Sequence, residues 1–168
     1  MNGFLVLLIL LLLFLLYLRF RLISKNKDER STYFRIKAAV DRVVSRHKLS
    51  ISEIDFFKNT VIGLDRRNKK LVLIIHKNNV VSENCLRLDE VSSCRVSKEA
   101  NQLSGCTKNV TLQLNLRDGE IVRFTFFDET RDKRHELHSR FKKAVYWQSN
   151  IQLHLNNIKA KYQFEYVV

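Results

Sequence analysis

Apolar residues run without interruption through the start of the chain. The first eighteen residues carry no charge, and every residue from Phe4 to Leu18 is apolar or aromatic. A helix of that length spans about 27 Å, close to the roughly 30 Å thickness of a bilayer's hydrocarbon layer. Arg19 and Arg21 follow, where basic side chains can extend into the headgroup region. We expect residues 1–21 to form a transmembrane signal anchor.

A cleaved signal peptide is the alternative interpretation of this segment. Such a peptide needs basic residues before the apolar run and small residues at a cleavage site after it. The run follows Met-Asn-Gly, and the segment 19–24 holds no site of the Ala-x-Ala type. Because the nearest cations follow the run, the positive-inside rule places the remaining chain in the cytoplasm. The expected location is the inner (cytoplasmic) membrane, crossed once, with a cytoplasmic C-terminal domain.

Polar residues and a helical repeat follow the apolar run. Residues 22–31 are mostly polar or charged and are expected to be a linker. Apolar side chains then recur at three- and four-residue steps, which predicts one face of an amphipathic helix over about 29–48. A second short helical turn is expected at 51–57, with Ser52 as its cap. We group residues 22–57 as linker and amphipathic helix.

The middle of the chain is typical of antiparallel strands. Two apolar runs, Thr60–Leu64 and Lys70–His76, flank a polar turn and predict a hairpin. The strongest signal is the alternating run Val110–Leu116, which is followed by Asp118-Gly119, a preferred two-residue hairpin turn. Further strand signals occur at 80–81, 91–96 and 121–127, and a polar loop is expected at 98–109.

A long helix is expected at the end of the chain, over about 129–160. Asp128 or Thr130 is the expected N-cap. One apolar seam, interrupted by Gln148, repeats at steps of three and four. Its members are Leu137, Phe141, Ala144, Ile151, Leu155 and Ile158.

The ordered set of strands and the final helix resembles the pleckstrin-homology-like (PH-like) fold, including its bacterial PH and GRAM-type relatives. The resemblance covers roughly 58–157 and is carried by the hairpin of Val61–Asp65 with Leu71–Ile75, the run Leu86–Val91, the Asp-Gly hairpin, and the final helix with Trp147. It implies an α+β fold: transmembrane helix, amphipathic helix, then an antiparallel PH-like sheet or partial barrel over 58–168, closed by the long C-terminal helix.

The charge balance points to anionic partners. The 168 residues carry 30 Lys and Arg against 17 Asp and Glu, a net charge of +13. The excess lies in the predicted helical regions, with ten basic against three acidic residues over 19–50 and eight against three over 131–168. Anionic phospholipid attracts such segments, and so does nucleic acid. Membrane tethering makes nucleic acid the less favoured partner.

No pattern in the chain indicates catalysis, a cofactor or a metal. His135 and His138 lie three residues apart, which differs from the His-Glu-x-x-His spacing of zinc enzymes, so we interpret them as a solvated helix face. Cys85, Cys94 and Cys106 form no Cys-x-x-Cys motif, and three is an odd number, so reduced thiols are expected.

Two basic clusters are the candidate contacts for an anionic ligand. The first lies in the polar turn of the predicted hairpin, and the second lies on the first half of the final helix, where Trp147 adds an aromatic ring that could stack on bases. The candidate residues are Arg66, Arg67, Lys69, Lys70, Arg140 and Lys143.

The sequence therefore predicts a non-enzymatic binding or scaffold module. Its expected partner is a protein of the same membrane or the anionic lipid surface. The alternative is a regulatory protein that forms a homodimer through the 137–158 seam or the 29–48 helix. A nucleic-acid-binding protein is a weaker alternative.

Overall fold

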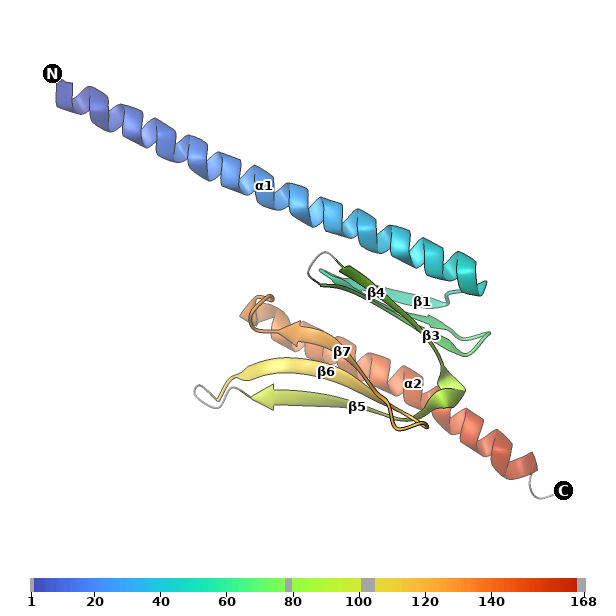
Figure 1. Ribbon diagram of the computed structural model, residues 1–168. Helices are drawn as coiled ribbons and strands as arrows, with labels where there is room; N and C mark the ends of the chain where they lie inside the picture. Colours follow the sequence, from blue (N-terminus) through green and yellow to red (C-terminus); the bar gives the residue numbers. More distant parts are fainter. Residues whose placement is uncertain (1, 78–79, 101–104, 166–168) are drawn as a thin grey trace.

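The computed structural model describes the backbone of residues 2–77, 80–100 and 105–165; within these ranges, the side chains of 2–6, 8–10, 20–30 and 157–165 are not described. Two helices, α1 (Asn2–His47) and α2 (Leu137–Glu165), and seven strands make up the chain (Figure 1). The strands are β1 (Glu53–Phe57), β2 (Thr60–Asp65), β3 (Lys70–Lys77), β4 (Val80–Arg87), β5 (Val91–Ala100), β6 (Thr107–Leu116) and β7 (Ile121–Asp128), with short 3-10 turns at Leu88–Glu90 and Arg134–Glu136.

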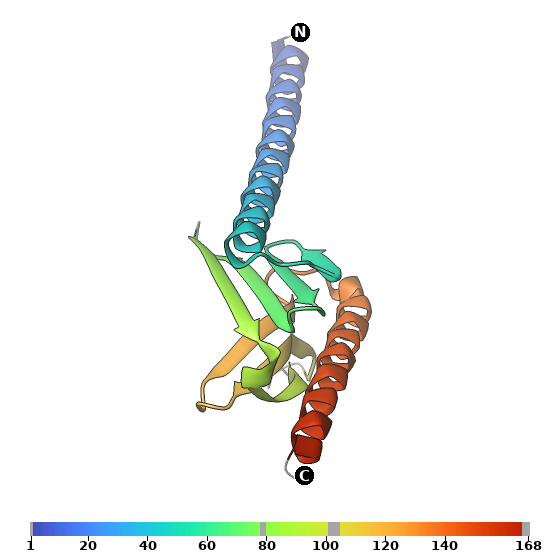
Figure 2. The same ribbon diagram turned by 90° about the vertical axis from the view of Figure 1, so that its right-hand side faces the viewer.

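Two antiparallel sheets form the body of the molecule. The first has the order β1-β2-β3-β4 and the second the order β5-β6-β7. They lie face to face, and α2 runs along the side where the first sheet ends at β1 (Figures 1 and 2). Since the two sheets share no ladder, the described strands do not close into a barrel. The α+β class, the antiparallel strands and the C-terminal helix are as the sequence predicts.

The main core fills the space between the two sheets and α2. Strand side chains alternate between faces, so Ile62 and Leu64 of β2 point into this core while Val61 points to the opposite face. Phe124, Phe126 and Phe127 of β7 and Trp147 of α2 contribute the largest buried side chains.

A second, smaller cluster joins α1 to the outer face of the first sheet. Ile36, Ala39, Val40 and Val43 of α1 are buried there against β2 and β3. The sheet is therefore covered on both faces, which explains why all six residues of β2 are buried. Only the last part of α1 lies on the sheet, and its N-terminal part extends away from the body (Figures 1 and 2).

Four expectations about local structure are wrong. The polar loop expected over 98–109 is shorter, because β5 continues to Ala100 and β6 begins at Thr107. The backbone of 22–31, predicted to be a linker, is helical and continuous with the rest of α1. This stretch contains no Gly or Pro, and five of its ten residues are Leu, Lys, Arg or Glu, which favour helices. The segment 51–57 holds a strand in place of a helical turn. The final helix begins at Leu137, and Asp128 accepts hydrogen bonds from Thr130 in the preceding turn, so it does not cap α2.

The predicted transmembrane segment lies partly outside the described residues. Residue 1 and the side chains of 2–6, 8–10 and 20–21 are not described. Within the part of the chain that is described, no helix combines the length and the apolar character needed to cross a bilayer.

Candidate functional site

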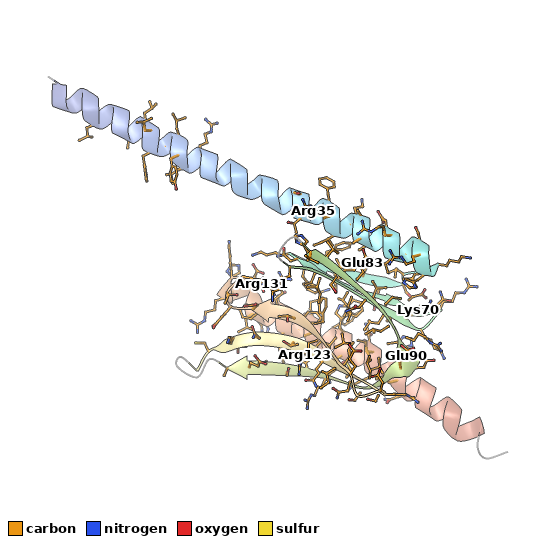
Figure 3. The ribbon with its side chains drawn as sticks, in the orientation of Figure 1. Arg35, Lys70, Glu83, Glu90, Arg123 and Arg131 are labelled. Carbon is orange, nitrogen blue, oxygen red and sulfur yellow. The ribbon has the colours of Figure 1, made fainter. Side chains whose placement is uncertain are left out.

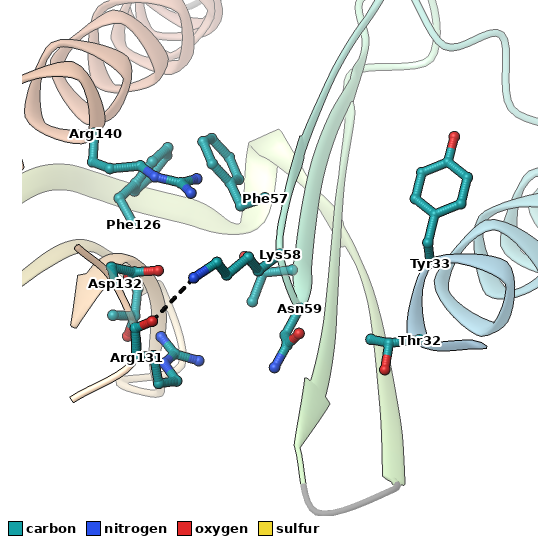
Figure 4. Close-up of a pocket in the computed structure, with 11 residues that line it drawn as sticks. Thr32, Tyr33, Phe57, Lys58, Asn59, Phe126, Arg131, Asp132 and Arg140 are labelled. Atoms are coloured by element: carbon teal, nitrogen blue, oxygen red, sulfur yellow. Dashed lines mark hydrogen bonds between the residues drawn. The ribbon is translucent and has the colours of Figure 1, made fainter. Parts of the chain in front are cut away.

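A cleft opens at the end of the body from which α1 departs. Its volume is about 540 Å³, within the range of roughly 300–1,000 Å³ typical of small-molecule sites. The turn between β1 and β2 separates α1 on one side from β7 and the start of α2 on the other (Figure 4). The lining residues are Thr32, Tyr33, Phe57, Lys58, Asn59, Thr60, Thr125, Phe126, Arg131, Asp132 and Arg140.

Aromatic rings form the inner wall of the cleft. The centroids of Phe57 and Phe126 lie 5.0 Å apart, and the two rings meet edge to face. Phe124 completes the group, at 5.0 Å from Phe126 and 6.2 Å from Phe57. Phe124 and Phe126 belong to the main core, so the inner wall of the cleft borders the core between the two sheets.

Three cations, Lys58, Arg131 and Arg140, line the rim of the cleft. Lys58 donates a hydrogen bond from Nζ to the carbonyl oxygen of Arg131 at 3.1 Å, as Figure 4 shows. The guanidinium carbon of Arg140 lies 4.9 Å from the centre of the Phe57 ring. Among the residues whose side chains are described, no carboxylate lies within ion-pair distance of Lys58. Its charge is therefore available to a ligand.

Neighbouring carboxylates hold the two arginines in place. Asp128 pairs with Arg131 at 3.3 Å, and Glu136 pairs with Arg140 at 2.9 Å. The hydrogen bond from Thr130 lowers the pKa of Asp128, and the hydrogen bond from Arg140 lowers the pKa of Glu136, so both carboxylates are ionised near neutral pH. A guanidinium carries five N–H donors, so each arginine keeps donors for a further anion.

The structure separates the candidate residues of the sequence. Arg140 lines the cleft, whereas the turn that holds Arg66, Arg67, Lys69 and Lys70 lies between β2 and β3. Figure 3 places Lys70 at the end of the body opposite Arg131. The two predicted clusters are therefore two distinct surfaces.

Two of the candidate cations are engaged within the fold. Lys143 contacts both carboxylate oxygens of Asp55 at 3.0 Å, and Arg66 lies 3.2 Å from Glu53. Both acids sit on β1, so these ion pairs contribute to holding β1 against its neighbours.

Trp147 does not form the predicted stacking surface. Its side chain is fully buried, and its Nε1–H donates to Asp55 at 2.8 Å. A buried ring cannot stack on a base, and Ala144, Ile151 and Leu155 of the same seam lie in the core with it. The seam proposed for a homodimer is therefore used within the molecule.

The residues that the sequence reasoning missed are Lys58 and Asn59. They form the two-residue turn between β1 and β2. Because residues 51–57 were predicted to be helical, neither β1 nor the turn between β1 and β2 was predicted. The signal that could have revealed it is a polar Lys-Asn pair between Phe57 and the next β run.

Other candidate chemistry receives no support from the described residues. Among them, no group of three His, Cys, Asp or Glu side chains is placed to hold a metal ion. His135 and His138 are both exposed, as expected of a solvated face. None of the three cysteines forms a disulfide, and burial raises the pKa of Cys94 to about 12.

No protein-family model, curated protein or solved structure matches this chain. The function is accordingly inferred from the geometry and charge of the cleft.

Proposed function

We propose that this chain is a non-enzymatic binding module, tethered to the inner (cytoplasmic) membrane by its first 21 residues, whose PH-like cytoplasmic domain binds an anionic group in the cleft. The observation that carries the proposal is the position of the cleft. Its cationic rim lies at the end of the body from which α1 leaves, so a tether in α1 would turn this rim toward the membrane.

The proposed tether is supported by the apolar run and by the continuity of α1. One helix of 46 residues connects that run to the outer face of the first sheet. A PH-like domain is supported by the element order, in which four strands, then three strands and a C-terminal helix follow one another.

A protein of the same membrane is the second candidate partner, and an exposed aromatic patch favours it. Tyr33 and Phe34 of α1 and Phe56 of β1 are 51%, 66% and 42% exposed. The Tyr33 ring lies 6.1 Å from both other rings. Exposed aromatic side chains are enriched in protein–protein interfaces, and these lie beside the cleft.

The alternatives proposed from the sequence are weaker. Burial of Trp147 removes the stacking residue expected for single-stranded nucleic acid. Ile36, Val40 and Val43 of the 29–48 helix are buried within the molecule, and so are Ala144, Ile151 and Leu155 of the 137–158 helix. Their burial makes a homodimer through these faces less favoured.

Native mass spectrometry of the full chain extracted from membranes tests this proposal. Lys58→Glu reverses the charge of Lys58, which pairs with no carboxylate among the described residues, and Arg67→Glu makes the same change at the opposite end. We expect anionic molecules bound to the wild type and to Arg67→Glu, and about ten-fold less on Lys58→Glu, because a charged hydrogen-bonding partner is lost. Equal occupancy of all three proteins would rule out the cleft as the binding site.

A further inference from the structure

We infer that the cleft binds a single-chain anionic amphiphile, one hydrocarbon chain bearing a phosphate or carboxylate head, taken up as a monomer outside the bilayer. This inference rests on the proposed function and names the ligand class of the same site. It follows from two observations: the mixed chemistry of the cleft and its height above the proposed tether.

The cleft offers separate surfaces to the two halves of such a molecule. Phe57 is half-buried and provides apolar surface to the cleft, and behind it lies the Phe126 ring, which is buried in the core between the sheets. Lys58 stands at the rim with Arg140, whose guanidinium lies over the Phe57 ring. A purely polar anion would leave the exposed part of Phe57 in water. A neutral hydrocarbon would leave Lys58, which pairs with no described carboxylate, without an anionic partner. An amphiphile with one charged head satisfies both.

Hydroxyl groups line the cleft on both sides of the turn between β1 and β2 (Figure 4). Thr32 and Tyr33 of α1 and Thr125 of β7 line the cleft, and all three are at least partly exposed. Hydroxyls donate hydrogen bonds to phosphate and carboxylate oxygens. They add donors for the head without adding charge.

The length of α1 sets the height of the cleft. The apolar run ends at Leu18, and among the described side chains of α1, Thr32 is the first that lines the cleft. The helical residues 19–31 between them span roughly 20 Å. A tilt of about 20°, the average for transmembrane helices, shortens this by only about 1 Å. Headgroups occupy roughly 5–8 Å beyond the hydrocarbon, so a water layer separates them from the cleft.

This height selects single-chain ligands. A phospholipid with two acyl chains keeps both chains in the hydrocarbon layer, and its head cannot reach the cleft. Each methylene contributes about 0.8 kcal/mol to membrane binding, and a single chain binds a membrane only marginally and reversibly. A single-chain amphiphile therefore leaves the bilayer as a monomer, and its chain can lie against Phe57 in the cleft.

Photo-crosslinking tests this inference with the full chain in phosphatidylcholine nanodiscs. The probes are lysophosphatidate and a fatty acid, each with a diazirine in the chain, and labelled residues are mapped by mass spectrometry. A probe in the bilayer labels residues 1–18, whereas a probe in the cleft labels Tyr33, Phe57 or Phe126. Comparison of the two probes shows whether the site prefers a phosphate or a carboxylate head.

We expect cleft labelling that falls at least about ten-fold in the Lys58→Gln/Arg140→Gln variant and stays unchanged in Arg67→Gln, the matched cation at the opposite end. Unlabelled lysophosphatidate should compete, while lysophosphatidylcholine, whose head has no net charge, should compete poorly. The competition experiment uses only the wild type, so it decides the question even if the double variant unfolds.

Labelling confined to residues 1–18 in every variant would overturn the inference. If inorganic phosphate competes as strongly as lysophosphatidate, the hydrocarbon chain contributes nothing, and the amphiphile is excluded while an anion-binding cleft remains. If neither competitor nor rim substitution changes the labelling, both the amphiphile and the proposed anionic ligand are excluded.

Discussion

Asp65 shows how one buried residue shapes the turn between β2 and β3. Its side chain is fully buried, and it accepts hydrogen bonds from the backbone N–H of Ser50 at 2.7 Å and of Asn68 at 2.8 Å. The Asn68 side chain donates a third at 2.7 Å. Burial alone would raise the pKa of Asp65, but these hydrogen bonds outweigh it and lower the pKa. Asp65 thus ties the basic turn to the segment that follows α1.

The replacement Asp65→Ala should lower the free energy of unfolding by about 2–3 kcal/mol near neutral pH, because it removes the charged acceptor of three part-buried hydrogen bonds. A carboxylate with a lowered pKa stabilises the fold above its unfolded value of about 3.9 and loses this effect as the pH falls through its folded value. Urea unfolding of both proteins should therefore show a difference that is constant above about pH 5 and shrinks below about pH 4. A difference independent of pH would contradict this role.

At the scale of elements, the long periodic patterns predicted strands and helices correctly, whereas the short strand β1 was not predicted. The Asp-Gly hairpin and the seam of α2 lie where the sequence places them, since each pattern extends over several residues. In β1, Glu53 and Asp55 face α2 while Ile54 and Phe56 are exposed. This is the reverse of the usual alternation, because the inward carboxylates are paired by α2. Hydrophobicity alone could not reveal this strand.

The contact between β1 and α2 gives a prediction for Trp147. Trp147→Ala removes the largest buried side chain of α2 and its hydrogen bond to Asp55, so it should cost about 3–5 kcal/mol of unfolding free energy. Leu153→Ala on the exposed face of the same helix is the matched control and should change stability by no more than about 0.5 kcal/mol. Chemical denaturation measures both. Similar losses in the two variants would show that α2 does not bury Trp147.

For the whole molecule, the sequence predicted the type of surface charge but not its arrangement. Arg140 was predicted as a ligand contact, and it lines the cleft. Lys58 was not predicted, because the strand before it, β1, was not predicted. The turn from Arg66 to Lys70 lies at the opposite end of the body. Lys58 and the pair Arg131 and Arg140 come from two segments distant in the sequence, and they meet only after the sheets are packed. A local sequence pattern cannot predict that residues so distant in the chain lie side by side.

We propose that the N-terminal segment holds the folded body at a membrane. Flotation with neutral phosphatidylcholine vesicles in about 1 M salt tests it most directly, because a Debye length of roughly 3 Å suppresses attraction by surface charge. The full chain should float with the vesicles, and a variant lacking residues 1–18 should stay in the dense fraction. A full chain that stays behind, or a truncated chain that floats equally well, would contradict the account.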